Sequence, residues 1–197
     1  MDLTFHRACL RDLPEVFALI QRATAHMLCL DIQQWDRFYP TKGVLRRDIL
    51  KGQLYTGRIG GHIVSIYVLN QECDTQYQNC AWRYLYAPWY CVHRLCVDPS
   101  FQNCRIGLQT MKQVEHQAYA CGGRSIRLDV FPHNPYAYRL YQTLGYEVVG
   151  IAHWRKGTFH LMEKKLTSIH DTKKPPCQQL YTAVGATKRS LERSSLL

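Results

Sequence analysis

Several features that would mark a particular class of protein are missing from this sequence of 197 residues. No stretch approaches the roughly 18 to 20 unbroken apolar residues that a membrane span requires, and the first residues, MDLTFHRACLRDL, carry charge where a signal peptide would be apolar. The nine cysteines include no C-x-x-C pair and are odd in number. We therefore expect no membrane segment, no metal site and no disulfide framework, but free thiols in a cytoplasmic protein.

Acidic residues are scarce relative to basic ones, since 15 Asp and Glu stand against 25 Lys and Arg, a formal net charge of +10. Clustered positive charge attracts polyanions, but these basic residues are spread along the chain, so nucleic acid is not the expected partner. Apolar residues make up 46% of the sequence, enough for one domain over residues 1–166. Residues 167–197 are mostly polar and basic, and they are predicted to form a mobile or weakly docked tail.

Hydrophobic periodicity and turn residues predict an α/β domain with a mixed sheet and helices on both faces. Gly60-Gly61 separates two β-branched and aromatic runs and predicts a hairpin, because both glycines tolerate positive φ. Two short helices are expected between residues 31 and 49, the second capped by Thr41. Residues 70–89 predict a long loop of the kind that lines binding sites. Strands are expected at 3–7, 54–59, 62–69, 90–97, 125–131, 146–154 and 159–166, and further helices after Asp12, Gly107 and Asn134.

The segment from Leu95 to Leu108, LCVDPSFQNCRIGL, is predicted to be a strand, a tight polar turn and the start of a helix. Such a junction directs unpaired amide N–H groups and the positive end of a helix at one point, which suits a pyrophosphate. Taken alone the signal is weak, because strand-to-helix turns with one glycine are common and are more often structural.

A second segment, from Asn134 to Tyr146, reads NPYAYRLYQTLGY and predicts a helix. Asn134, Ala137 and Tyr141 share one side of this helix at spacings of three and four, so Tyr141 could face a groove. The alternative is an ordinary amphipathic helix in which Ala137, Leu140, Tyr141 and Leu144 fill the core. The residues by themselves leave this choice open.

Together and at this spacing, the two segments resemble the GNAT superfamily of N-acetyltransferases. The family pattern is a strand ending V-x-P, then Q/R-x-x-G-x-G/A opening a helix, then N-x-x-A-x-x-[LF]-Y-x-x-x-G-[FY] after the next strand. The matching residues are Val97, Pro99, Gln102, Gly107, Asn134, Ala137, Leu140, Tyr141, Gly145 and Tyr146. The resemblance covers roughly residues 5–166 and implies a GNAT-like fold, with a central, mostly antiparallel sheet of six to seven strands.

The resemblance also implies an acyltransferase that uses acetyl-CoA. By resemblance, the backbone of residues 95–97 pairs with pantetheine and polarises the acetyl carbonyl, Asn134 binds the pantetheine arm, and Tyr141 donates a proton to the departing CoA thiolate. Residues 102–108 would hold the pyrophosphate. The expected cofactor-binding residues are Leu95, Cys96, Val97, Gln102, Asn103, Cys104, Arg105, Ile106, Gly107, Leu108, Asn134, Ala137 and Tyr141.

Arg105 departs from the family pattern, because it stands where the first glycine of the G-x-G/A pair is usual. Its side chain could obstruct close approach of the backbone to phosphate, or it could turn outward and add a cation beside it. We favour the second, since a guanidinium suits phosphate oxygens.

The incoming amine must lose a proton, because an alkylammonium has no lone pair with which to attack a thioester. His93 is the first candidate base, Asp129 the second and Glu72 the third. Relay through water, with His93 merely satisfied by the backbone, stays an alternative. If the chain folds as the family does, Trp35, Tyr39, Tyr67 and Trp154 surround the acceptor entrance, although core packing is an alternative for each.

We expect direct transfer in a ternary complex rather than an acetyl-enzyme on Cys96 or Cys104, since neither thiol has an obvious activating partner. The acceptor is expected to be a small-molecule or peptide amine. Two rival functions are a CoA-binding protein without turnover and an acetyltransferase acting on aminoacyl-tRNA or ribosomal protein. A homodimer is the common prior for such a protein. The aromatic run around Trp35 and Tyr39 resembles a segment of small bacterial GNAT proteins, which favours a bacterial origin.

Overall fold

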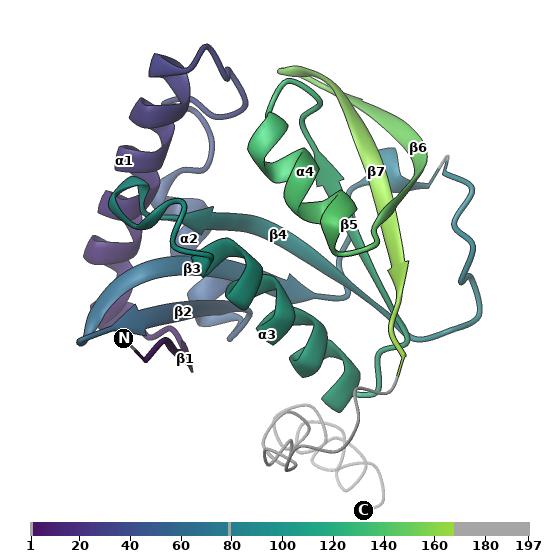
Figure 1. Ribbon diagram of the computed structural model, residues 1–197, viewed down its shortest axis with the longest axis horizontal. Helices are drawn as coiled ribbons and strands as arrows, with labels where there is room; N and C mark the ends of the chain where they lie inside the picture. The colour runs from purple at the N-terminus through teal and green to yellow at the C-terminus, as the bar shows by residue number, and fades with distance from the viewer. Residues whose placement is uncertain (1, 79, 168–197) are drawn as a thin grey trace, which may run out of the picture. The chain divides into compact units, whose positions relative to one another are not determined.

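One seven-stranded sheet, in the order β1-β2-β3-β4-β5-β7-β6, organises the computed structural model, which describes residues 2–78 and 80–167 (Figure 1). All neighbouring strands are antiparallel except the parallel pair β4 and β5. The predicted mixed, mostly antiparallel sheet is therefore confirmed. Apart from Thr167, the predicted tail lies outside the described residues. The strands are β1 (Thr4–Arg7), β2 (Leu54–Ile59), β3 (His62–Asn70), β4 (Trp89–Val97), β5 (Ser125–Val130), β6 (Glu147–Trp154) and β7 (Gly157–Lys165).

Two helices lie against each face of the sheet (Figure 1). Helices α1 (Leu13–Cys29) and α2 (Lys42–Leu50) cover one face, and α3 (Ile106–Ala120) and α4 (Pro135–Thr143) cover the other. The predicted cap is present, since the Thr41 hydroxyl accepts from the backbone N–H of Val44 at 3.2 Å. The β2–β3 hairpin is confirmed too, with φ of 57° at Gly60 and 86° at Gly61.

The first of the two short helices expected between residues 31 and 49, over the aromatic run before Pro40, does not form. The α1–α2 connection (residues 30–41) instead makes a turn closed by an isolated bridge between Asp36 and Tyr39. The Asp36 carboxylate accepts the backbone N–H of Phe38 at 2.9 Å, a local side-chain bond that offers the backbone an alternative to the helix. This prediction was wrong because an aromatic run signals burial, not the backbone conformation that achieves it.

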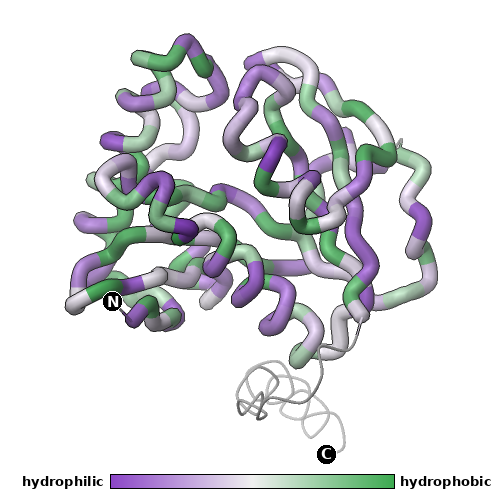
Figure 2. The backbone as a smooth tube through the Cα atoms, in the orientation of Figure 1, coloured by the Kyte–Doolittle hydropathy of each residue, from purple (hydrophilic) through white to green (hydrophobic). Residues whose placement is uncertain are grey.

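The strands in the middle of the sheet contribute to the hydrophobic core on each of its two faces. The hydropathy of the chain is high along these strands (Figure 2). In β3, Ile66 and Val68 pack toward α1 and α2, whereas Tyr67 and Leu69 pack toward α3. Side chains of a strand alternate between faces, so a strand buried on both sides reads as one continuous apolar run. The core between the sheet and α3 also takes Met111 and Val114 from that helix.

A bulge in β4 separates the two halves of the sheet. Cys96 pairs with Ile66 and His93 with Val68, so Arg94 and Leu95 together stand opposite the single residue Tyr67. Arg94 has a left-handed backbone, with φ of 52°. Strand β4 pairs with β5 only over residues 89–91 and 125–127, before the bulge, and beyond it the two strands separate (Figure 1).

The described part of the β3–β4 loop (residues 71–78 and 80–88) covers the rest of the face that carries α1 and α2, next to β4 and β5. It is fastened by Arg127 of β5, whose guanidinium lies between the rings of Trp82 and Trp89, 4.5 and 4.7 Å from their centroids. Glu163 of β7 is the counter-ion at 3.3 Å, and it also accepts the backbone N–H of Arg83 at 2.8 Å. Both charged residues are buried, Arg127 being 6% and Glu163 3% exposed.

The Glu163→Gln variant should lose about 3 kcal/mol of unfolding free energy, because it leaves the buried Arg127 charge without its counter-ion. Urea denaturation measures this loss. The matched control is Glu147→Gln, which removes the partner of Arg83 from an exposed ion pair and should cost less than about 1 kcal/mol. Equal losses in the two variants would contradict a buried, charge-dependent anchor for the loop.

Candidate functional site

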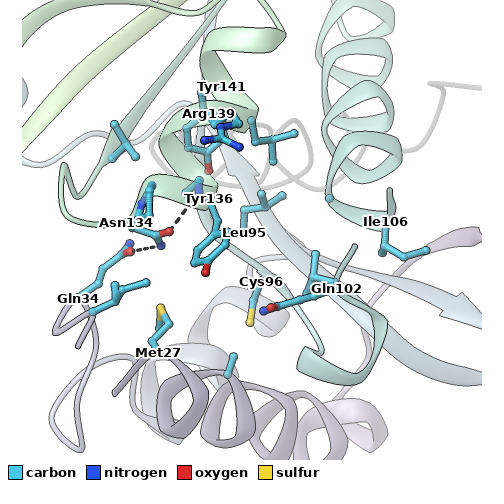
Figure 3. A pocket seen from close by; sticks show the side chains of 18 of the residues that line it. Met27, Gln34, Leu95, Cys96, Gln102, Ile106, Asn134, Tyr136, Arg139 and Tyr141 are labelled. Atoms are coloured by element: carbon cyan, nitrogen blue, oxygen red, sulfur yellow. Dashed lines mark hydrogen bonds between the residues drawn. The ribbon is translucent and has the colours of Figure 1, made fainter. Parts of the chain in front are cut away.

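The separation of β4 from β5 opens a cleft of about 800 Å³, bounded by the end of β4, the start of α3, α4 and the second half of α1 (Figure 3). Every predicted cofactor-binding residue except Cys104 lines it. Cys104 is exposed in the turn before α3 and does not line the cleft, because the turn places it outward. Two segments recognised separately in the sequence are thus brought together at one cavity.

The turn before α3 is shaped by two left-handed residues, Asn103 with φ of 61° and Arg105 with φ of 60°. The first bond of the helix is from the N–H of Gln109 to the carbonyl of Arg105, so the N–H groups of residues 106–108 have no acceptor within the helix. These groups and the positive end of the helix lie at the wall of the cleft, which suits an anion. Arg105, at the N-cap, occupies a conformation in which glycine is favoured.

Asn134 caps α4 and joins it to the α1–α2 connection. Its amide oxygen accepts the N–H of Ala137 at 3.1 Å, and its amide nitrogen donates to Gln34 at 2.9 Å (Figure 3). Both residues line the cleft. Sequence reasoning missed Gln34, because a polar residue in an irregular segment carries no periodic signal.

Tyr141 lines the cleft from the next turn of α4 and is only 6% exposed. Its ring packs on Tyr146 with centroids 5.8 Å apart. Burial raises the pKa of the Tyr141 phenol, so the hydroxyl keeps its proton at neutral pH and is available as a donor. Tyr141 therefore fills the core and also faces the cavity, so the two interpretations of this helix are both partly correct.

His93 of β4 and Asp129 of β5 lie on the sheet face opposite α3. Each residue lies just beyond the point where the two strands separate. Asp129 lines the cleft, accepts the Tyr77 hydroxyl at 2.7 Å and has a pKa raised by burial. His93 does not line the cleft itself. Its Nε2 lies 3.2 Å from Oδ1 of Asn70 and 3.0 Å from the carbonyl of Glu72, and burial lowers its pKa.

Glu72, the third candidate base, is held in a structural role. Its carboxylate accepts from Lys51 at 2.8 Å and from Gln53 at 2.9 Å, and the Lys51 bond is the main cause that lowers the pKa of Glu72. A carboxylate so paired is a poor proton acceptor.

Cys96 is unsuited to be a nucleophile, because burial raises the pKa of its thiol.

The four residues expected around the acceptor entrance do not gather there. Trp35 lines the cleft, and Tyr39 lies outside it beneath the guanidinium of Arg94, whose carbon is 5.5 Å from the ring centroid. Trp154 packs edge-on against Phe159 at 5.1 Å instead.

The prediction that Tyr67 lies at the acceptor entrance is wrong, since its side chain is fully buried on the α3 face. Its hydroxyl donates to Gln117 at 2.6 Å and its ring stacks on Tyr55 at 5.1 Å. The continuous apolar run of β3 does not reveal which face each side chain takes, and this caused the error.

Several lining residues have no counterpart among the predicted ones. Tyr136 points from α4 into the cleft, and Arg139 lies one turn further along the same helix (Figure 3). Their spacing of three could have placed them on one side of the helix with the groove. His26 and Met27 enter from α1, where nothing in the sequence linked them to the two motifs.

Among the described residues, no helix is both long and apolar enough to cross a membrane.

A profile of the acetyltransferase (GNAT) family matches residues 37–146, more than half of the chain. The chain therefore belongs to the GNAT family and is an acetyl-CoA-dependent N-acetyltransferase. The family resemblance seen in the two motifs is thereby confirmed. A sequence comparison with curated proteins finds no match.

Solved structures share this fold at low sequence identity. A GNAT-family acetyltransferase from Streptococcus agalactiae has a TM-score of 0.72 and 20% identity, over 85% of this chain and 96% of that one. The PaiA N-acetyltransferase from Thermoplasma acidophilum, in complex with coenzyme A, has a TM-score of 0.64 and 17% identity, over 84% and 99%. The ribosomal-protein-S18-alanine N-acetyltransferase from Escherichia coli has a TM-score of 0.61 and 14% identity, over 87% and 99%.

Arg105→Gly should stabilise the free protein by about 1 kcal/mol, because a left-handed backbone is unfavourable for a residue with a Cβ. Thermal or urea unfolding tests this expectation. Arg105→Lys is the control, since it keeps both the Cβ and the charge and should leave stability unchanged. A loss of stability in Arg105→Gly would mean that contacts of the side chain outweigh the backbone strain.

Proposed function

We propose that this enzyme transfers the acetyl group of acetyl-CoA directly to a primary amine in a ternary complex. The observation that carries the proposal is the single cleft that unites the free N–H groups at the start of α3, the unpaired edge of β4 and the Tyr141 side chain. Binding of coenzyme A by the similar structure from Thermoplasma acidophilum supports the same use of this cleft.

The phosphates of the cofactor would lie at the start of α3. The N–H groups of residues 106–108 offer donors there, and Arg105 and Arg139 line the same cleft. Neither arginine forms an ion pair with an acid among the described residues, so both guanidinium groups are available to phosphate oxygens. This favours the interpretation of Arg105 as an added cation rather than an obstruction.

The pantetheine arm would add to the free edge of β4. Residues 95–97 pair with β3 on one side, but beyond the bulge they have no strand partner on the β5 side. A buried main-chain amide without a partner is costly, and an extended arm with its own amides can satisfy it. An N–H of this edge would also stabilise negative charge on the acetyl oxygen as the amine attacks.

Proton transfers accompany both bond changes. The protonated amine loses one proton to His93 or Asp129, and its lone pair attacks the thioester carbon. As the tetrahedral intermediate collapses with loss of the thiolate, the nitrogen gives its second proton to solvent, and Tyr141 gives its proton to the sulfur and is reprotonated from solvent. We propose no acetyl-cysteine intermediate, because burial raises the pKa of the Cys96 thiol and makes it a poor nucleophile. The acceptor is a small-molecule or peptide amine in this proposal, and the homodimer, the cytoplasmic location and the bacterial origin stay predictions.

Release of free thiol from acetyl-CoA in the presence of a panel of amines and peptides tests the proposed transfer. Tyr141→Phe should bind CoA as the natural enzyme does but turn over about 100-fold more slowly, because it lacks the proton donor. Tyr146→Phe is the matched control, since it removes the hydroxyl from the neighbouring ring outside the cleft and should keep its activity. Binding of CoA without turnover of any acceptor would favour the non-catalytic rival.

Calorimetric titration with CoA tests the phosphate site separately. Arg105→Gly should weaken binding several-fold through the lost cation, although it stabilises the free protein, whereas Arg105→Lys should bind nearly as well as the natural enzyme. Tighter binding by Arg105→Gly would identify the side chain as an obstruction. A protein that binds neither CoA nor acetyl-CoA would refute the use of the cleft altogether.

A further inference from the structure

A chain of five polar residues leads from the surface to the His93 ring. Lys51 donates to the Glu72 carboxylate at 2.8 Å, and Gln53 donates to the same carboxylate at 2.9 Å. The amide of Asn70 donates to the Gln53 oxygen at 3.1 Å. The last member is His93, whose Nε2 lies 3.2 Å from the Asn70 oxygen.

Chemistry fixes the direction of each hydrogen bond in this chain. An ionised carboxylate only accepts, so the amide nitrogen of Gln53 must face Glu72, and its oxygen must therefore face Asn70. A second contact confirms the orientation of Asn70, because its Oδ1 accepts the backbone N–H of Glu72 at 3.0 Å, and a backbone N–H only donates. The amide oxygen of Asn70 thus faces His93.

Two acceptors therefore surround Nε2 of His93. One is the Asn70 oxygen and the other is the backbone carbonyl of Glu72, 3.0 Å away. A ring nitrogen between two acceptors carries a hydrogen. Since burial disfavours the charged ring, the neutral form has its hydrogen on Nε2 and its lone pair on Nδ1.

We propose that Asn70 is a positioning residue that holds His93 in the Nε2–H tautomer, so that Nδ1 is the atom that accepts the proton from the acceptor amine. This inference rests on the proposed function. In the step, an N–H bond of the protonated amine breaks, an Nδ1–H bond forms, and the freed lone pair makes the bond to the thioester carbon. As the C–S bond then breaks, the nitrogen gives its second proton to solvent and the sulfur takes the proton of Tyr141. The imidazolium then returns its proton to solvent.

Charged groups from four elements act on the ring. Asp129 of β5 and Asp74 of the β3–β4 loop favour the imidazolium, whereas Arg94 of β4 disfavours it. Asp48 of α2 and the Glu72 carboxylate also interact with the charge on His93. Burial is the largest influence and places the pKa of His93 below its usual 6.5. The base is consequently unprotonated at neutral pH, and activity should fall only as the pH drops below that pKa.

The experiment compares the enzyme with Asn70→Asp by NMR titration of the histidine ring nitrogens and by the pH profile of kcat/KM. In the natural enzyme, the neutral His93 ring should give the Nε2–H signature. A carboxylate at position 70 should raise the ring pKa by about one unit and move the acid limb of the profile upward by the same amount. Gln71→Glu is the control, because it adds the same charge at an exposed neighbour that contacts Trp89 rather than His93, and it should shift both much less.

Each other outcome has a defined meaning. An Nδ1–H signature in the natural enzyme would overturn the proposal without any variant, so a poorly folding Asn70→Asp does not prevent the test. A shifted ring pKa with an unmoved acid limb would also overturn it, because His93 would then not be the base. If no amine is acetylated by any form, the proposed function fails instead, while the NMR signature still decides whether the His93 ring is held in the Nε2–H form.

Discussion

The bulge at Arg94 and Leu95 is the constraint on which the rest of this structure depends. Two residues of β4 oppose one residue of β3 there, and β4 runs beside β5 only before that point. The left-handed backbone of Arg94 is held by its side chain, which pairs with Asp48 of α2 at 3.3 Å and lies over the ring of Tyr39. An inserted residue bends a strand and re-aims its side chains, and here it turns a sheet into two halves with a cleft between them.

The same bulge separates the proposed bases from the strand edge at which the cofactor is proposed to bind. His93 precedes it and lies on the face of α1 and α2, with Asp129 on the neighbouring strand. Beyond it, the strand edge at Leu95 faces the cavity that α3 and α4 share. In the proposed reaction, the amine and the thioester would approach the gap from opposite sides. Direct transfer would use such an arrangement, because both reactants must be present at once.

The α1–α2 connection then fastens one half of the sheet to the other. Gln34 bonds to Asn134 at the start of α4, and Asp36 bonds to Arg155 at 2.7 Å, in the turn between β6 and β7. The Arg155 bond, helped by Lys156, lowers the pKa of Asp36 to about 2, so this link is charged throughout the neutral range. The α1–α2 connection, which the sequence predicted to be a short aromatic helix, instead forms hydrogen bonds to the other half of the sheet.

The sequence by itself determined the order of strands and helices and the two motifs that line the cleft, because caps, hairpin glycines and periodicity act over a few residues. Tertiary structure alone decided which face Tyr67 takes and that Gln34 meets Asn134, 100 positions away. It also brought Gln53, Asn70 and His93 into one chain of hydrogen bonds. Such contacts depend on strand pairing and on the bulge, and those join residues that no local pattern connects.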